Sequence, residues 1–392
     1  MDARQAIAKR LKEARERLGI TQDDLAKQVG IQNRQTIGEI EKGTREIKAW
    51  ELVELANALH LDINHLLLNP SQEPAKVLWR DVTEASAPDV EAEFLKRCSQ
   101  YYELEQLCDL EKAKEFPRTE ADPVSFSERD AEELARECQR DFDLGSFPAD
   151  SLLSVLENRY RVKIWYESLS GRGSAAASRG PFGCAILMNA DEAPWRRNFN
   201  FAHEVFHLIT WGCFAPALLE SNAEMKAKAE KFADVFAARL LMPAEGFESA
   251  VEARIDKGKI SYLSLVELAR RFDVSTTALL IRMKDARFIA STEVSRILSD
   301  RHFKQLDTRS MPEKWWTPPR MPPRFVNLAF FAYKSGRLSR LMCADLLGVK
   351  LAGLDDVIRQ YDLPESDSLD TRIPITCDPT GDDEGEASVP AP

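Results

Sequence analysis

Cysteine is scarce in this sequence and follows no metal-binding spacing. The chain has seven cysteines among 392 residues, an odd number, and no Cys-x-x-Cys pair. Cysteine zinc sites use closely spaced pairs, and disulfide-stapled secreted domains use an even, dense set. We therefore expect reduced thiols, a cytoplasmic location and no zinc site built from cysteine.

Long apolar runs and an excess of positive charge are also lacking. No apolar run reaches about 18 residues, and the N-terminus leads into an amphipathic helix pattern, so we expect no signal peptide and no membrane partner. The net charge is −11, and residues 1–70 carry 11 basic and 11 acidic side chains. Any binding to nucleic acid must come from a local basic face, because the overall charge repels phosphate.

Histidine is rare too, yet two of the five histidines stand in one motif, His203-Glu204-Val205-Phe206-His207. On a helix, positions i and i+4 lie on one face, one turn apart, so two imidazoles can share a metal ion. Glu204 can turn its carboxylate toward a water at that metal. The alternative is a pair of surface histidines with a solvated glutamate, but the apolar residues around the motif favour a buried helix.

Zinc needs a third protein ligand and keeps its fourth position for water or substrate. The best candidate is Glu230, which begins a Glu-Lys-Phe-Ala-Asp run that ends at Asp234. Asp234 shares a helical face with Glu230 and can accept the second N–H of a ligand histidine, which would fix the imidazole tautomer. We expect this helix to end near Pro243.

Residues 197–207 and 230–243 together resemble the ImmA/IrrE family of zinc metallopeptidases, and the likeness covers roughly residues 127–283. The resemblance implies a zinc metalloendopeptidase with Zn²⁺ as its cofactor in a gluzincin-like site. It also implies the roles of the site residues, namely His203, His207 and Glu230 as ligands and Glu204 as general base. Two positions depart from the family pattern. Phe206 stands where a small residue is usual and affects the shape of the pocket, while Asp234 replaces the usual asparagine and remains an acceptor.

The N-terminal segment has the spacing of a helix-turn-helix domain. Five short helices are expected in residues 1–69, and the runs 21–26 and 36–43 resemble the Cro/repressor (XRE) family of DNA-binding domains, with one extra residue in the turn. Amide and guanidinium groups at a helix N-terminus can reach base edges, and nearby cations can bind phosphates. The predicted DNA contacts are Gln22, Asn33, Arg34, Gln35, Lys42 and Arg45. The alternative is a five-helix protein-interaction module, which the neutral charge balance favours.

The expected fold is multidomain and mostly α-helical. An all-α N-terminal domain precedes an α+β gluzincin-like peptidase domain with a small sheet, and a helical region follows. The predicted segments are an XRE-type helix-turn-helix domain at 1–69, a linker and long helix at 70–126, an ImmA/IrrE-like zinc peptidase domain at 127–285, a helical C-terminal region at 286–366 and a disordered tail at 367–392.

The middle segments are predicted to contain a long helix, two strands and a loop. Residues 89–114 are predicted to form one long helix, either a dimer-forming coil or, more simply, a helix that packs on its own domain. Alternation predicts strands at 160–166 and 183–189, and the Gly/Ser-rich stretch 168–180 is predicted to be a mobile loop. The second strand could pair with an extended substrate, unless it is an internal strand with no free edge.

These features predict a DNA-binding metallopeptidase that regulates transcription. Its expected partners are a double-stranded DNA operator, bound as a homodimer, and a protein substrate such as a helix-turn-helix repressor or a toxin–antitoxin partner. The alternative is a transcriptional regulator or antitoxin-like binder in which the peptidase fold serves as a non-catalytic sensor.

Overall fold

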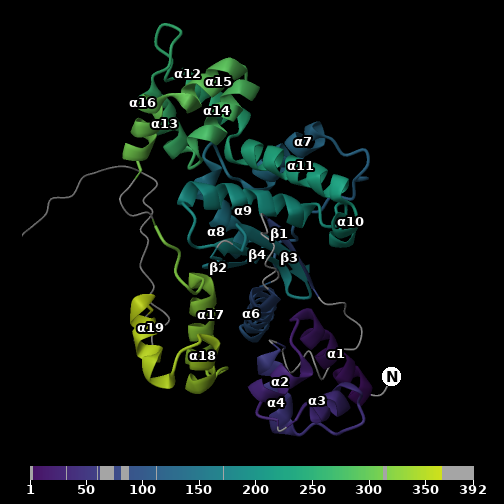
Figure 1. Ribbon diagram of the computed structural model, residues 1–392. Helices are drawn as coiled ribbons and strands as arrows, with labels where there is room; N and C mark the ends of the chain where they lie inside the picture. The colour runs from purple at the N-terminus through teal and green to yellow at the C-terminus, as the bar shows by residue number, and fades with distance from the viewer. Residues whose placement is uncertain are drawn as a thin grey trace, which may run out of the picture.

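The computed structural model of the chain describes residues 3–31, 33–59, 61, 75–80, 88–111, 113–170, 172–311 and 316–363. Helices dominate these residues, and their strands form one small sheet (Figure 1). The expected mostly helical, multidomain fold is confirmed. None of the described helices is both long and apolar enough to cross a membrane.

The N-terminal helices pack around a small apolar core. They are α1 (Ala3–Arg17), α2 (Gln22–Gln28), α3 (Arg34–Glu41) and α4 (Ala49–Ala58). Thr21 and Asn33 begin α2 and α3, because each side chain accepts a hydrogen bond from the backbone N–H three residues later. Gly30 lies in the turn between these helices with a φ of +69°. The fifth helix predicted for this segment lies outside the described residues, as does the tail at 367–392.

A four-stranded sheet forms the centre of the second unit. Its strands are β1 (Lys76–Arg80), β2 (Lys163–Glu167), β3 (Ala175–Gly180) and β4 (Gly183–Asn189), in the order β1-β3-β4-β2. β3 pairs antiparallel with both β1 and β4, and β2 pairs parallel with β4. In the register, Leu78 lies opposite Ala177, which in turn lies opposite Ile186.

One sequence prediction about this sheet is wrong, and one of its strands was not predicted. Residues 175–180 are not part of a mobile loop, because they form the buried strand β3, whose small side chains fit between the layers on either side. The predicted linker contains a strand, β1, that pairs with β3 across nearly 100 intervening residues. Small residues and a five-residue run without alternation carry little local strand signal, so the pairing partner decides their structure.

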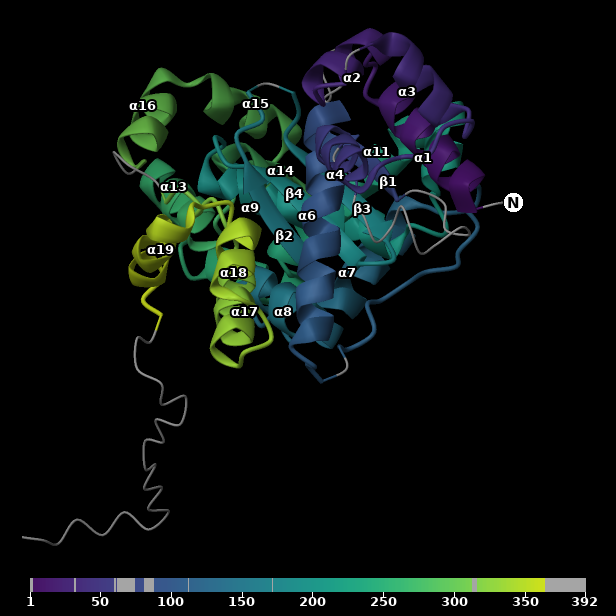
Figure 2. The ribbon, with the colours of Figure 1, turned by 90° about the horizontal axis from the view of Figure 1, so that it is seen from below.

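Helices cover both faces of the sheet, and each face has its own apolar core. α9 (Pro194–Ile209) lies on one face and α11 (Ala223–Leu241) packs along it, while α6 (Pro88–Leu107) crosses the other face (Figures 1 and 2). The other helices on the α9 side are α7 (Glu128–Phe142), α8 (Leu152–Asn158), α10 (Pro216–Ser221), α12 (Ala244–Glu252), α13 (Tyr262–Arg271), α14 (Thr276–Asp285), α15 (Ser291–Ser299) and α16 (Arg301–Arg309), with a short 3-10 helix at Pro148–Asp150.

The C-terminal helices share the apolar core on the α6 side of the sheet. They are α17 (Pro323–Lys334), α18 (Arg340–Leu346) and α19 (Leu354–Gln360), with a 3-10 turn at Leu351–Gly353, and α17 packs directly against α6. The buried Glu105 carboxylate of α6 holds α17 and the sheet together, because it pairs with Arg324 of α17 and with Lys163 of β2. The apolar stripe of α6 is buried within this chain, as the simpler prediction for the long helix stated.

Candidate metal centre

The His-Glu-x-x-His motif lies in the buried half of α9. This helix begins at Pro194, a residue suited to the first helical turn because its missing N–H would have no partner there. Every residue from Asn200 to Ile209 is buried. His203 and His207 therefore face the same neighbours one turn apart, with their ring centroids 4.9 Å from one another.

Glu230 of α11 approaches both imidazoles. Its carboxylate oxygens lie 3.2 Å from Nε2 of His203 and 3.6 Å from Nε2 of His207, and the two Nε2 atoms are 3.1 Å apart. Tetrahedral zinc with bonds of about 2.0–2.1 Å requires ligand atoms about 3.3 Å apart. The three side chains, which are brought together from two helices, thus match the spacing and the chemistry of a zinc ligand set.

Asp234, one turn beyond Glu230, lies behind His203. Its Oδ1 is 2.9 Å from Nδ1 of His203. Because a carboxylate only accepts hydrogen bonds, His203 donates from Nδ1 to Asp234, and its Nε2 is the ring atom that faces His207 and Glu230. The Nδ1 atom of His207 is buried and has no hydrogen-bond partner among the described residues.

Burial and charge set the protonation of these groups. Burial, together with the neighbouring His203, lowers the pKa of His207 to about 3, so this imidazole is neutral at physiological pH. Burial acts on His203 in the same direction, but hydrogen bonds to Asp234 and Glu230 outweigh it and raise the pKa of His203. Burial raises the pKa of Glu230, yet the hydrogen bond with His203 and the charges nearby bring it below its usual value.

Glu204 lies beside the metal ligands in a narrow cleft. The cleft has a volume of ≈ 260 Å³, and Glu204, His207 and Glu230 are among the residues that line it. β1 forms one wall and the α10–α11 region forms the other, and these walls are lined by Val77, Leu78, Trp79, Leu219, Glu220 and Lys226. Glu204 is fully buried, so its carboxylate is shielded from bulk water where a reacting group would lie.

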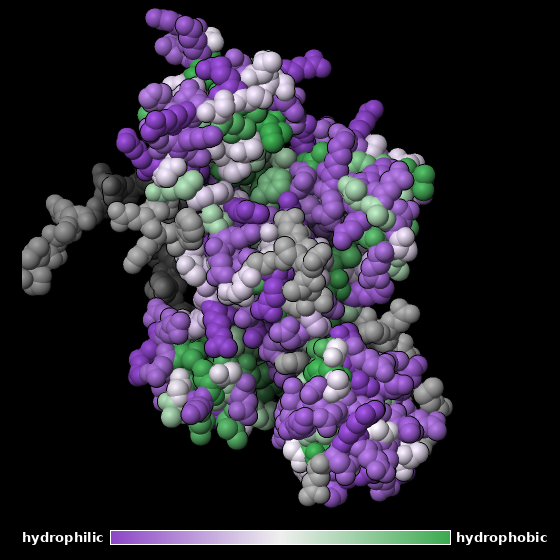
Figure 3. Space-filling view, viewed as in Figure 1, coloured by the Kyte–Doolittle hydropathy of each residue, from purple (hydrophilic) through white to green (hydrophobic). Residues whose placement is uncertain are grey.

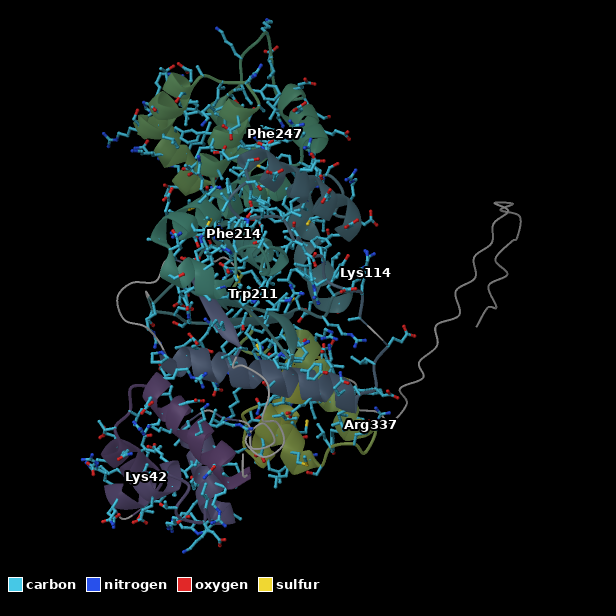
Figure 4. The ribbon with its side chains drawn as sticks, turned by 90° about the vertical axis from the view of Figure 1, so that its right-hand side faces the viewer. Lys42, Lys114, Trp211, Phe214, Phe247 and Arg337 are labelled. Atoms are coloured by element: carbon cyan, nitrogen blue, oxygen red, sulfur yellow. The ribbon has the colours of Figure 1, made fainter. Side chains whose placement is uncertain are left out.

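Phe206 does not narrow this cleft, although its size departs from the family pattern. Its side chain is fully buried and packs against the rings of Phe126, Phe214 and Phe236. Figure 4 places Phe214 and Trp211 close together in this part of the molecule. The larger side chain is therefore accommodated by the aromatic core behind α9.

The strand predicted to accept a substrate is not available for that role. β4 lies between β3 and β2, so both of its edges are paired within the sheet, as the alternative interpretation stated. β1 occupies the edge beside the cleft. Lys76 and Arg80 direct their carbonyl groups toward β3, to Ser178 Oγ and Ser174 N. Strand alternation therefore turns the backbone groups of Val77 and Trp79 away from β3 and toward the cleft.

The predicted DNA contacts divide into two groups. Asn33, Arg34, Gln35 and Lys42 are exposed on or beside α3, although the Asn33 side chain also caps this helix. Figure 4 shows Lys42 at the outer side of the N-terminal helices, away from the sheet. Arg34 Nε and Gln22 Oε1 are 3.5 Å apart, which joins α3 to α2.

Gln22 and Arg45 are engaged within the N-terminal domain. Gln22 donates to the buried carboxylate of Glu41, which also pairs with Arg15 of α1. Arg45 forms two hydrogen bonds to Glu51, whose side chain is almost fully buried. Both residues therefore orient α3 and α4. A DNA phosphate that contacts Gln22 or Arg45 would have to compete with the carboxylate of Glu41 or Glu51 for the same side chain.

One charged residue beside the candidate metal centre was not predicted from the sequence. Arg80, at the end of β1, donates to Asp234 Oδ1 at a distance of 3.0 Å, and its guanidinium lies over the ring of Phe199. No local motif marks Arg80, because it follows a short run outside both resemblances. Only the long-range pairing of β1 with β3 brings it to this site.

Comparison with protein families supports the two-part organisation. Residues 11–66 match the family model described as Helix-turn-helix, and residues 159–284 match the model described as IrrE N-terminal-like domain, a peptidase family. No curated protein matches the chain. The chain thus joins an XRE-type DNA-binding domain to a metallopeptidase-like domain of the ImmA/IrrE type, and the predicted fusion is confirmed.

Proposed function

We propose that this protein is a DNA-binding zinc metallopeptidase that regulates transcription by cleaving a regulatory protein. The observation that carries the proposal is the convergence of His203, His207 and Glu230 at zinc-ligand spacing, with Glu204 in the same cleft. A structural zinc site would be closed by four protein ligands, whereas a three-ligand set beside a cleft is typical of catalytic zinc.

His203, His207 and Glu230 would hold Zn²⁺, and the protonation states of the site fit this role. His207 is neutral, and Asp234 accepts the Nδ1 proton of His203, so Nε2 of His203 would bind the metal once it gives up the proton that it shares with Glu230. When bound, zinc would acidify water and polarise a substrate carbonyl as a Lewis acid. The remaining steps belong to side chains of this chain.

Glu204 would act as the general base and then as the general acid. Its carboxylate takes a proton from the attacking water while the water oxygen forms a bond to the peptide carbonyl carbon. The same proton then passes to the amide nitrogen as the C–N bond breaks, which gives an amine and a carboxylic acid, and the acid proton then moves to the amine as the products leave as carboxylate and ammonium. Burial shields Glu204 from bulk water, so the transferred proton stays within the site.

An extended substrate segment would lie along β1. The outward backbone groups of Val77 and Trp79 can pair with a peptide as an added strand, and Leu78 and Leu219 offer apolar contacts. An exposed or partly unfolded segment of a protein fits such a cleft, because only an extended chain can pair with a strand edge. A helix-turn-helix repressor or a toxin–antitoxin partner bound near the same operator would be presented by the DNA-binding domain.

Metal analysis and a base variant test the proposal. The purified protein should carry about one zinc per chain, and His203→Ala or Glu230→Ala should lose it. Glu204→Gln should keep zinc, because Glu204 is not a ligand. It should also abolish cleavage, which is measured as the new N-termini that appear in cellular proteins when the wild-type protein is expressed. Glu220→Gln, at the rim of the same cleft, serves as the control and should retain cleavage. Full zinc content in both ligand variants would reject the ligand set, and new termini produced equally by Glu204→Gln would reject the base.

A further inference from the structure

We propose that Arg80 is a positioning residue of the metal centre, supplied by the segment that joins the DNA-binding domain to α6. This inference rests on the proposed function, because it concerns how tightly His203 is held for zinc. Arg80 lies outside the 159–284 match, so this chain completes the surroundings of its zinc ligands with a residue from elsewhere.

The contact between Arg80 and Asp234 falls on the atom that holds His203. Oδ1 of Asp234 lies 3.0 Å from the Arg80 guanidinium and 2.9 Å from Nδ1 of His203. The Asp234 side chain is half exposed, at 53%, so packing alone does not fix its rotamer. Arg80 is only 14% exposed and therefore provides the more rigid end of the pair.

The end of β1 is fixed by several independent contacts. The Arg80 carbonyl accepts a hydrogen bond from Ser174 N, and the guanidinium lies 5.7 Å from the centre of the Phe199 ring on α9. Gly173 permits the close approach, because a Cβ there would lie 3.2 Å from the Arg80 carbonyl oxygen and from the Trp79 ring. Arg80 thus links three elements, namely β1, α9 and α11, at the back of His203.

Lys76, at the other end of β1, provides a matched comparison. Its ammonium lies 3.2 Å from Glu220, but both side chains are well exposed, at 45% and 60%. This pair is on the rim of the cleft and does not touch a predicted zinc ligand. Lys76 and Arg80 have the same charge and belong to the same strand. Only Arg80, however, contacts a residue that is hydrogen-bonded to a predicted zinc ligand.

Positioning and simple electrostatics make opposite predictions for zinc affinity. Removal of a positive charge near a cation site should strengthen zinc binding if Arg80 acts only through its field. If Arg80 holds Asp234 on His203, its removal should weaken zinc binding because the imidazole loses its orientation. The sign of the change therefore identifies the role of Arg80.

The experiment measures Zn²⁺ affinity of the full chain by competition with a chelating dye. Asp234→Ala should lower Zn²⁺ affinity about 10- to 100-fold, as for other residues that orient zinc-bound histidines. Arg80→Met should lower Zn²⁺ affinity roughly 3- to 10-fold, because Arg80 contacts Asp234 and not the histidine itself. The double variant should bind zinc no more weakly than Asp234→Ala alone. Lys76→Met should match wild type.

A second variant covers the case in which Arg80→Met disturbs the strand. Arg80→Lys keeps the charge, so electrostatics predict no change, whereas loss of the planar guanidinium fork predicts a measurable loss of affinity. Unchanged or tighter zinc binding by Arg80→Met or Arg80→Lys would overturn the inference, and so would additive losses in the double variant. Failure of wild type to bind zinc would instead overturn the proposed function, which keeps the two failures distinct.

Discussion

The protonation of the two histidines of the candidate metal centre is set by different means. His207 is neutral because it is fully enclosed, and burial lowers its pKa to about 3. His203 depends on a specific partner, because Asp234 fixes its tautomer and raises its pKa against the effect of burial. A change at Asp234 should therefore alter His203 far more than His207, although the rings are in contact.

A buried carboxylate in the N-terminal domain supports a prediction about stability and pH. The hydrogen bond from Arg45 lowers the pKa of Glu51, against the effect of burial. This contribution to folding is present above the ordinary glutamate pKa, about 4.3, and is lost as the pH falls through the lower folded value. Arg45→Ala should destabilise the domain by about 1–2 kcal/mol at neutral pH, and the difference from wild type should shrink in acid.

Hydrogen–deuterium exchange of the α4 amides in the full chain would report this local change. Arg4→Ala is the control, because the pair between Arg4 and Glu46 is exposed and such pairs contribute little. Unchanged α4 exchange in Arg45→Ala at neutral pH would show that Arg45 is not needed to hold Glu51. Arg45 would then be available to bind a DNA phosphate, as the sequence predicts.

At the scale of whole elements, β1 is an edge strand of the sheet and lines the cleft that contains Glu204. Val77→Pro should remove an outward N–H that a substrate would use, without breaking the β1–β3 ladder, since proline is tolerated on the open side of an edge strand. Loss of one backbone hydrogen bond predicts a rise in KM of about 3- to 10-fold, with kcat and zinc content little changed.

Two matched variants make the β1 experiment specific. Val77→Ala removes the same side chain but keeps the N–H, so its KM should stay near that of wild type. Leu78→Pro should break the ladder, because the carbonyl groups of Lys76 and Arg80 face β3 and strand alternation therefore turns the backbone of Leu78 to the same side, opposite Ala177. Equal KM values for Val77→Pro and Val77→Ala, measured on a substrate identified from its new termini, would show that substrates do not pair with β1.

Elements with a helical period were predictable, and elements that depend on distant partners were not. The i, i+4 spacing of His203 and His207, and of Glu230 and Asp234, places each pair on one helical face, and the structure has helices at both. Strand β3 was predicted as part of a loop because residues 168–180 are rich in glycine and serine, and its pairing with two neighbours overrides that composition. Arg80 could not be found locally, because its role depends on that same pairing.

The recognition helix α3 supports a prediction about sequence specificity. Arg34 and Gln35 are exposed at its N-terminal end, where side chains of helix-turn-helix proteins meet base edges. Replacing both with alanine should weaken binding to the operator by roughly 1–3 kcal/mol for each good base contact, with little effect on random DNA. Lys42→Ala should instead weaken binding to all sequences alike and reduce the salt slope by about 1.

Titration of labelled operator and random duplexes at several salt concentrations would measure both effects. Arg34→Ala/Gln35→Ala and Lys42→Ala serve as controls for each other, because each removes one positive charge from the same helix region. Absence of any operator enriched by the full protein over random DNA at physiological salt would favour the protein-interaction alternative for this domain.

At the scale of the molecule, the C-terminal helices complete one face of the sheet. The buried pairs of Glu105 with Lys163 and Arg324 join α6, β2 and α17, and removal of one partner of such a pair is costly. Exposed apolar side chains remain on this C-terminal unit, among them Phe331, Leu341 and Met342. Figure 3 shows apolar surface over the region of α17–α19, remote from the cleft.

The coupling of DNA binding to proteolysis can be tested in the whole molecule with one variant. Glu204→Gln leaves the zinc ligands and the N-terminal domain intact, so zinc content and operator binding should match wild type, while cleavage should be lost. A reporter gene under the native operator, followed together with immunoblots of the candidate substrate, compares the two proteins.

If proteolysis controls transcription, wild type should derepress the reporter as the substrate band disappears, and Glu204→Gln should do neither. A non-catalytic sensor has no use for a base at position 204. Equal regulation by both proteins, with the substrate intact, would therefore reject the peptidase and support the sensor.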